Sequence, residues 1–313
     1  MAASNTYERQ NPAFYALLAA LIFMSVGPIV LMFANSFKLD VDIISGTSGL
    51  FFLPTIQNYE TALCDILPYE LEHLDFCTLK FGGAFINSII ISLVSTVLTL
   101  VIGTMAAYAL VRFRFMGRDA ASLTTLMLRM VPPAVLLVPV FGLWNNEFCI
   151  DRTNFIGELI RDTFGGRGDV CLAGTRSGII LVYIAMNLPF VIWILQSFIV
   201  QVPYSLEEAA RVDGATPFQV FFRVVLPLIK PGLAAAAIFT FRIAWNEYLL
   251  ASALSDRDTK TVPILIVNNM SEFNVEWGVI MATGVLLAIP PIIFTLLASR
   301  QIITGMTAGA VKG

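Results

Sequence analysis

The chain has 313 residues, of which 57% are hydrophobic and only 13% are charged, and its formal net charge is −3. A soluble domain has about a quarter of its residues charged, so this composition excludes an ordinary soluble globular protein and indicates a protein embedded in a membrane. The slightly acidic balance also excludes a basic surface for binding nucleic acid.

Six apolar runs, each long enough to cross a bilayer, follow one another along the chain. They occupy residues 14–34, 85–110, 121–144, 178–200, 232–254 and 278–298. The first run can also be interpreted as a signal peptide, but its leader is barely basic and no clear small-residue cleavage site follows it. The sequence therefore predicts one all-α membrane domain over residues 1–313, with six transmembrane helices and no appended soluble domain.

The distribution of basic residues predicts how these spans are oriented. Six spans place both termini on one side of the membrane, and short loops rich in Lys and Arg face the cytoplasm. Segments 1–12, 111–120, 201–231 and 299–313 carry nine Lys and Arg residues in about 68 positions, against eight in about 104 positions on the other side. We therefore expect cytoplasmic N- and C-termini and a cytoplasmic segment 201–231.

The four cysteines, Cys64, Cys77, Cys149 and Cys171, all lie in the two long loops assigned to the outer side. An even number of cysteines in an oxidising compartment favours disulfides. Pairing within each loop, as Cys64–Cys77 and Cys149–Cys171, is the simplest of three connectivities, and four free thiols are the alternative. No metal site is predicted, because the spacings do not fit zinc and His73 is the only histidine.

The polar segment 203–231 separates the fourth and fifth spans and carries the signals of two short helices. Ser205 is a suitable N-cap for the first helix, and Glu208, three residues later, completes a capping box. Gly214 can adopt the left-handed conformation that ends a helix. The sequence therefore predicts a helix–glycine–helix unit on the cytoplasmic side.

The second helix of this unit is predicted to begin at Thr216, with Pro217 in the first helical position and Gln219 completing another capping box. Pro227 is expected to end it, because its ring clashes with the preceding turn and it has no N–H group. The helix carries an apolar stripe at helical spacing, made of Phe218, Phe221, Phe222 and Val225. This stripe can pack either on the chain's own spans or on a partner protein.

The sequence lacks the residue patterns of an enzyme. No lysine follows a glycine, so there is no phosphate-binding P-loop. A single histidine argues against Ser–His catalysis, and no catalytic residue is predicted. The chain is therefore expected to be a conduit. A secondary transporter of a small polar solute is the alternative, which would need membrane-embedded carboxylates for ion coupling, and Glu247 is the only candidate.

A longer motif overlaps the helix–glycine–helix unit. It consists of Glu208-Ala209-Ala210, Gly214 after three further residues, and Val224-x-Leu226-Pro227 after nine more. This order and spacing resemble the EAA loop of importer-type ABC permeases. Asn187–Trp193, Trp245–Glu247 and the tail Gly305–Gly313 resemble the carbohydrate branch, closest to the second permease subunit of maltose-type importers. The resemblance covers nearly the whole chain except the two cysteine-bearing loops.

The resemblance implies a type I ABC importer permease fold and a multi-pass protein of the bacterial inner membrane. It also implies three kinds of partner besides the bilayer and the substrate: a homologous permease, two ATPase subunits, and a periplasmic solute-binding protein. ATP and Mg would be bound by the ATPase subunits, and this chain would hold no cofactor. The implied substrate is a sugar, a polyol or a sugar derivative, and the sequence does not identify it.

The resemblance further assigns the EAA loop to coupling with an ATPase subunit. The implied coupling residues are Glu208, Ala209, Ala210, Gly214, Phe218, Phe221, Leu226 and Pro227. In such loops the glutamate pairs with a basic residue of the ATPase, and the glycine allows the sharp turn. Glu208 can also serve only as the acid of the capping box, and the two interpretations are compatible.

Charged and kinked positions inside the spans give further candidates. Arg242 lies about ten residues into the fifth span, where charged residues usually face a cavity or a partner. With Asn246 and Glu247 it can line the substrate pathway. The alternative is an internal Arg242–Glu247 pair or an interhelical pair. Arg129 is expected to snorkel toward the cytoplasmic interface, and the following Pro132-Pro133 is expected to bend the third span.

Two further segments are assigned by resemblance. Phe273 and Asn274 lie in the third outer loop, which aligns with the loop that reaches into the binding protein of maltose-type importers. The tail Gly305–Gly313 is similar to tails that reach between the ATPase subunits, and a disordered end is the alternative.

Overall fold

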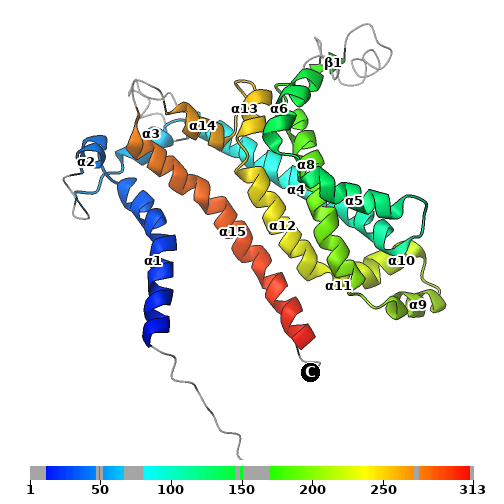
Figure 1. The fold of residues 1–313 in the computed structure, drawn as a ribbon. Helices are drawn as coiled ribbons and strands as arrows, with labels where there is room; N and C mark the ends of the chain where they lie inside the picture. Colours follow the sequence, from blue (N-terminus) through cyan, green and yellow to red (C-terminus); the bar gives the residue numbers. More distant parts are fainter. Residues whose placement is uncertain are drawn as a thin grey trace, which may run out of the picture. The chain divides into compact units, whose positions relative to one another are not determined.

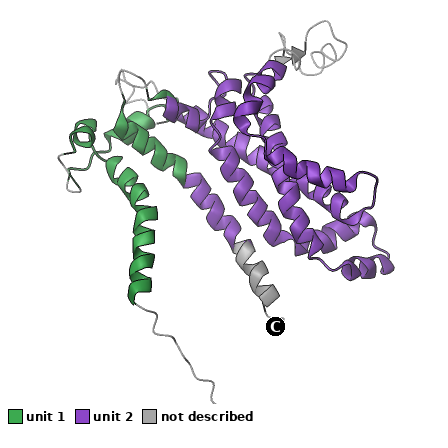
Figure 2. Ribbon diagram, viewed as in Figure 1, with its two compact units in different colours: residues 1–80, 268–288 green, residues 81–267, 289–313 purple. Residues whose placement is uncertain are grey.

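The computed structural model describes residues 12–46, 49, 52–66, 80–144, 149–150, 170–270 and 275–310. These residues form two compact units, shown in different colours in Figure 2. The first unit comprises residues 1–80 and 268–288, and the second comprises residues 81–267 and 289–313.

The first unit is organised around a buried asparagine. Its helices are α1 (Pro12–Asn35), α2 (Asp40–Ser45), α3 (Gln57–Ala62) and the first part of α15 (Trp277–Ala310). Asn58 donates hydrogen bonds to the carbonyl oxygens of Ser36 and Lys38, at 2.9 and 2.7 Å. Gly278 lies against the same side chain, where an added Cβ would come within 2.5 Å of the Asn58 amide. Asn58 therefore ties α3 to the end of α1 and to the start of α15.

The second unit contains the long helices α4 (Phe81–Arg112), α8 (Arg176–Val200) and α12 (Lys230–Trp245), which lie side by side in Figure 1. Small residues let α4 and α8 approach closely. At Gly103 an added Cβ would lie 2.6 Å from Val191 Cγ1. Buried hydroxyl side chains are spaced along α4. Two of them, Ser92 and Thr99, donate hydrogen bonds to carbonyl oxygens of the preceding turn. The core of this unit is thus a close helix–helix contact typical of membrane bundles.

The second unit also contains the second part of α15, and its remaining elements are short. Helices α5 (Arg118–Arg129) and α6 (Pro133–Gly142) precede strands β1 (Cys149–Ile150) and β2 (Val170–Cys171), which pair antiparallel. The loop between α8 and α12 contains α9 (Tyr204–Val212), α10 (Pro217–Val220), η3 (Phe221–Val225) and α11 (Leu226–Leu228). Helices α13 (Leu249–Leu254) and α14 (Val262–Asn268) follow α12.

Four helices in the described residues are long and apolar enough to cross a membrane: α1, α4, α8 and Trp277–Ser299 of α15. Two bent pairs raise the number to six if each pair is one span. Helices α5 and α6 meet at 98° around Pro132-Pro133, so the predicted bend of the third span is confirmed. Helix α12 ends at Trp245, so residues 232–254 do not form one continuous helix.

Candidate functional site

The first helix of the loop between α8 and α12 is α9 (Tyr204–Val212). Pro203 is its N-cap and makes no side-chain capping bond, so the prediction of Ser205 as N-cap is wrong. The fixed φ of proline already sets the entry to the helix at Pro203, which places Ser205 inside the first turn. Gly214 follows the helix with φ of +85°, which confirms its role as the left-handed residue at the end.

The second helix begins as α10 (Pro217–Val220), and its predicted capping box is present. Thr216 Oγ1 accepts the N–H of Gln219 at 3.4 Å, and Gln219 Oε1 accepts the N–H of Thr216 at 2.8 Å. The helix then continues through the π-turn η3 (Phe221–Val225) into α11 (Leu226–Leu228).

Pro227 does not end this helix, so that prediction is wrong. The N–H of Leu226 bonds the carbonyl oxygen of Phe221, five residues back, and this wider turn accommodates the proline that follows. The chain changes direction at Ile229, where the segment Pro217–Leu228 meets α12 at 74°.

The predicted apolar stripe of the second helix divides between two environments. Phe221 and Val225 are buried, and the Phe221 ring packs on Tyr108 of α4 with centroids 4.9 Å apart. Phe218 and Phe222 are 70% and 54% exposed, and their rings stack at 6.4 Å. One half of the stripe therefore holds the helix on this chain, and the other half is open to a partner.

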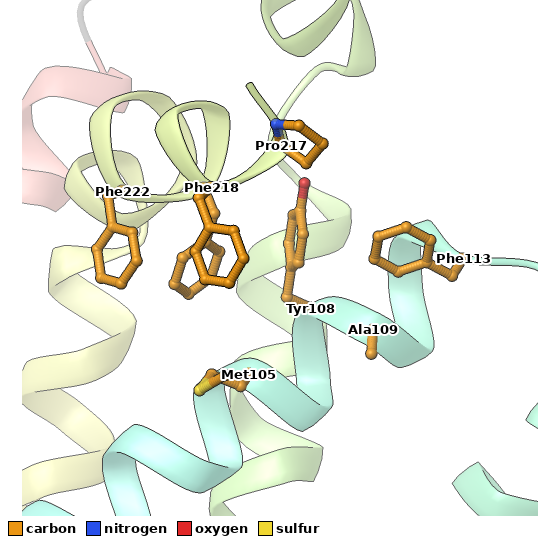
Figure 3. Close-up of a pocket in the computed structure, with 8 residues that line it drawn as sticks. Met105, Tyr108, Ala109, Phe113, Pro217, Phe218 and Phe222 are labelled. Atoms are coloured by element: carbon orange, nitrogen blue, oxygen red, sulfur yellow. The ribbon is translucent and has the colours of Figure 1, made fainter. Parts of the chain in front are cut away.

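An apolar pocket of about 220 Å³ lies between this helix and the C-terminal end of α4. In Figure 3 the rings of Phe218 and Phe222 point from the loop helix toward Met105 and Tyr108 of α4, and Phe113, just after the end of α4, lies beside Tyr108. The lining residues are Met105, Tyr108, Ala109, Phe113, Pro217, Phe218, Phe221 and Phe222.

The residues of the EAA motif lie mostly on the open side of the loop. Glu208, Ala209 and Gly214 are exposed, and Ala210 is half-buried. Of the two motif residues after η3, Leu226 is half-buried and Pro227 is exposed. The exposed carboxylate of Glu208 is thus available to a partner, as the resemblance requires.

The neighbouring Glu207 was missed by sequence reasoning, and it is fully buried. Its carboxylate accepts hydrogen bonds from Tyr108 Oη at 3.0 Å and from Arg112 Nε at 2.5 Å. Arg211 Nη2 lies 3.9 Å from it. Tyr108 and Arg112 are four residues apart, so their side chains share one face of α4. This pair of donors on one face is the sequence signal that could have indicated a buried carboxylate such as Glu207 opposite them.

Arg211 itself lies at the exposed side of α9. Its Nη1 donates to the hydroxyl of Tyr204 at 3.1 Å, and this bond raises the pKa of Arg211 above its ordinary value. The guanidinium therefore stays charged, close to the Glu207 carboxylate.

The candidate substrate residues lie at the end of α12. Arg242 is exposed, and Asn246, also exposed, donates from Nδ2 to the Arg242 carbonyl oxygen at 2.9 Å. The Glu247 carboxylate accepts from Tyr183 Oη and from the N–H groups of Leu250 and Ala251, each at 2.9 Å. Glu247 thereby starts α13, and this explains why the predicted fifth span is interrupted.

Arg242 forms no ion pair with Glu247 in the described part of the chain, so the first form of the alternative, an internal Arg242–Glu247 pair, is not found. Arg129 stands at the end of α5 and stacks on two rings of α8, with its guanidinium carbon 4.3 Å from the Phe190 centroid and 5.7 Å from that of Trp193. Such stacking on aromatic faces is typical of arginine.

The loops predicted to lie on the outer side are described only in part. Cys64 is disulfide-bonded, and Cys77 lies outside the described residues. Cys149 and Cys171 are directly opposite each other in the β1–β2 ladder. The two predicted pairings remain predictions. Phe273 and Asn274 lie outside the described residues, as does the tail beyond Ala310.

Comparison with known proteins relates this architecture to transport systems. Residues 99–306 match the family "binding-protein-dependent transport system inner membrane component". The trehalose transport system permease protein SugB of Mycobacterium tuberculosis is 39% identical over 236 residues, covering 74% of this chain and 78% of that protein. The diacetylchitobiose uptake system permease protein DasC of Streptomyces coelicolor is 32% identical over 305 residues, covering 97% and 96%.

A solved structure shares the fold. It is that of a bacterial ABC transporter that imports the acidic polysaccharide alginate, and the similarity covers 94% of this chain and 98% of the other, with a TM-score of 0.63 and 23% identity. The family match spans most of the chain, from α4 to α15. The chain belongs to the family of inner-membrane components of binding-protein-dependent transport systems, the permease subunits of ABC importers.

Proposed function

We propose that the chain is one of two homologous permease subunits in an ATP-driven importer of a sugar, a polyol or a sugar derivative. In this assembly two ATPase subunits bind ATP and Mg, and a periplasmic solute-binding protein delivers the substrate. Relatives at 39% and 32% identity are permeases of trehalose and diacetylchitobiose systems, and a trehalose/maltose permease of Thermococcus litoralis is 32% identical over 95% of this chain. These names support a carbohydrate substrate.

The observation that carries the proposal is the two-sided construction of the loop. Phe221 and Val225 fasten the second loop helix to the spans, whereas Glu208 and Phe218 remain exposed. Large exposed apolar side chains on the second loop helix, together with an exposed carboxylate on the first, are suited to contact a protein partner. The chain has no P-loop of its own, so the energy for transport has to come from another subunit.

We assign this exposed surface to an ATPase subunit. The coupling residues are those of the resemblance: Glu208, Ala209, Ala210, Gly214, Phe218, Phe221, Leu226 and Pro227. Phe221 is buried, so it acts by holding the helix, and Phe218 acts by direct contact. When the ATPase subunits close on ATP, the loop would carry the attached spans with it as a rigid body.

The pathway for the substrate is assigned to the end of α12. Arg242 is exposed there without an internal counterion in the described residues, which fits a position facing a cavity shared with the partner permease. Glu247 contributes by holding the break between α12 and α13. Because its carboxylate is already bonded to Tyr183 and to two N–H groups, this geometry does not favour the ion coupling of a secondary transporter.

Purification of the assembled transporter tests the assignment. The chain, solubilised from its native host in mild detergent, is expected to bring down a second permease and an ATPase subunit. Purification of the chain without any ATPase subunit would contradict the proposal. A thermal-shift screen of the cognate binding protein against sugars, polyols and sugar acids then identifies the substrate. Stabilisation by none of these, together with stabilisation by amino acids or peptides, would overturn the carbohydrate assignment.

A further inference from the structure

Helix α9 depends on a single buried side chain. Glu207 is the only one of its nine residues that is buried, and all nine are described. An isolated helix of this length is unstable in water, so its position has to come from tertiary contacts. Its N-cap Pro203 adds no side-chain capping bond. The buried contact between α9 and the spans is therefore made by the side chain of Glu207.

The partner of this carboxylate joins three segments of the chain. Arg112, at the end of α4, donates from Nε to Glu207 Oε1. Its Nη2 donates to the carbonyl oxygens of Ile199 and Val202, at 3.1 and 2.7 Å. These carbonyls lie at the C-terminal end of α8, where the helix dipole favours a positive charge. The Arg112 guanidinium thus holds α4, α8 and α9 together. We call the contact between Arg112 and Glu207, with the carbonyl groups at the end of α8, the joint.

Tyr108 extends the same joint to the second loop helix. Its hydroxyl donates to Glu207 Oε2 at 3.0 Å, and its ring packs on Phe221 at 4.9 Å. Tyr204, in the first turn of α9, lies with its ring 5.7 Å from the Arg112 guanidinium carbon. Both helices of the loop therefore meet Tyr108 of α4, and α9 also meets Arg112.

We propose that Glu207 is a positioning residue, which fixes α9 in one orientation on the ends of α4 and α8 through Arg112 and Tyr108. A buried ion pair is a poor source of net stability, but it specifies a geometry, because either charge left alone in the interior is strongly unfavourable. The two adjacent glutamates then divide their work. Glu207 faces inward and sets the orientation of the helix, and Glu208 faces outward.

The consequence for transport rests on the function proposed above. A force on the exposed face of α9 reaches α4 and α8 through this joint, so both spans move with the loop. Without the joint, α9 could reorient while the spans stay in place, and ATP hydrolysis would continue without uptake.

A distance measurement tests the orientation directly. Nitroxide labels are placed on Leu98→Cys in α4 and Val212→Cys in α9, both exposed positions, in the full-length protein. Double electron–electron resonance is expected to show one narrow distance distribution. Glu207→Ala is expected to broaden it, and Glu207→Asp is expected to restore most of the narrow component. Glu208→Ala, a neighbouring exposed carboxylate, is the matched control and should leave the distribution unchanged.

Arg112→Lys provides the second variant if Glu207→Ala does not fold. Lysine keeps the charge but lacks the planar fork that donates to Glu207 and to the α8 carbonyls at once. It should therefore also broaden the distribution. A narrow, unshifted distribution in the Glu207→Ala protein, or in Arg112→Lys if only that variant folds, would overturn the proposal. The distance measurement requires no ATPase subunit, so the positioning role of Glu207 can fail or succeed independently of the proposed transport function.

Discussion

At the scale of single residues, side chains that look alike in sequence occupy opposite environments. Glu207 and Glu208 are adjacent acids, yet the first is buried against Arg112 and the second is exposed. Arg112 and Arg242 both stand near span ends. Arg112 is bonded to two helices, whereas Arg242 has no counterion within the described residues. The contacts of each side chain, and not its charge alone, assign its role.

The exposed position of Arg242 leads to a prediction for transport. On the proposal that the Arg242 guanidinium faces the pathway and contacts the polar substrate, we expect Arg242→Ala to abolish uptake in the reconstituted transporter. Assembly with the ATPase subunits and basal ATP hydrolysis should remain intact, since no described bond of the fold involves this side chain. Normal uptake by the variant would remove Arg242 from the pathway.

The capping bonds of the loop lead to a prediction for stability. Thr216→Ala removes the bond from the N–H of Gln219 and should cost about 1 kcal/mol of stability, measured by thermal unfolding in detergent. Ser205→Ala is the matched control, since Ser205 lies within α9 and does not cap it. It should change the midpoint little. An equal loss in both variants would contradict the observed helix start.

At the scale of elements, contacts from distant segments decide where helices bend and end. Pro132 and Pro133 bend the third span because a proline ring interrupts the helix at its own position. The bend could therefore be predicted from the sequence. The end of α12 at Trp245 depends on Glu247, whose carboxylate is held by Tyr183 of α8. The sequence around Glu247 gives no indication of that contact, because Tyr183 is far away along the chain. The six apolar runs could be predicted because a bilayer imposes length and apolarity, whereas the burial of Glu207 could not, because it depends on how α9 meets α4.

The close approach of α4 and α8 leads to a prediction at this scale. Gly103→Ala should destabilise the protein by about 1–3 kcal/mol, because the new methyl would lie 2.6 Å from Val191 Cγ1 in a packed interface. Gly83→Ala is the matched control on the same helix, where an added Cβ meets nothing within 4 Å. It should be neutral or slightly stabilising. Thermal unfolding of the two variants in the same detergent compares them, and an equal effect would argue against the close packing.

At the scale of the whole molecule, the chain is a multi-pass inner-membrane protein built to work in an assembly. Its helices leave large apolar side chains exposed along α1, α4 and α6, as lipid and partner subunits require. A buried carboxylate with two basic neighbours, Glu207 with Arg112 and Arg211, lies instead at the loop between α8 and α12. That loop is therefore interpreted as the place where force from the ATPase subunits enters the permease.

ATP-driven uptake into proteoliposomes tests this central claim most directly. The complete transporter is reconstituted with ATP inside and with the loaded binding protein outside, and uptake and ATP hydrolysis are measured together for the unmodified protein and for Glu208→Lys. The account predicts uptake that requires both ATP and the binding protein, and a variant that hydrolyses ATP without uptake. Full coupling in Glu208→Lys, or uptake driven by an ion gradient without ATP, would contradict it.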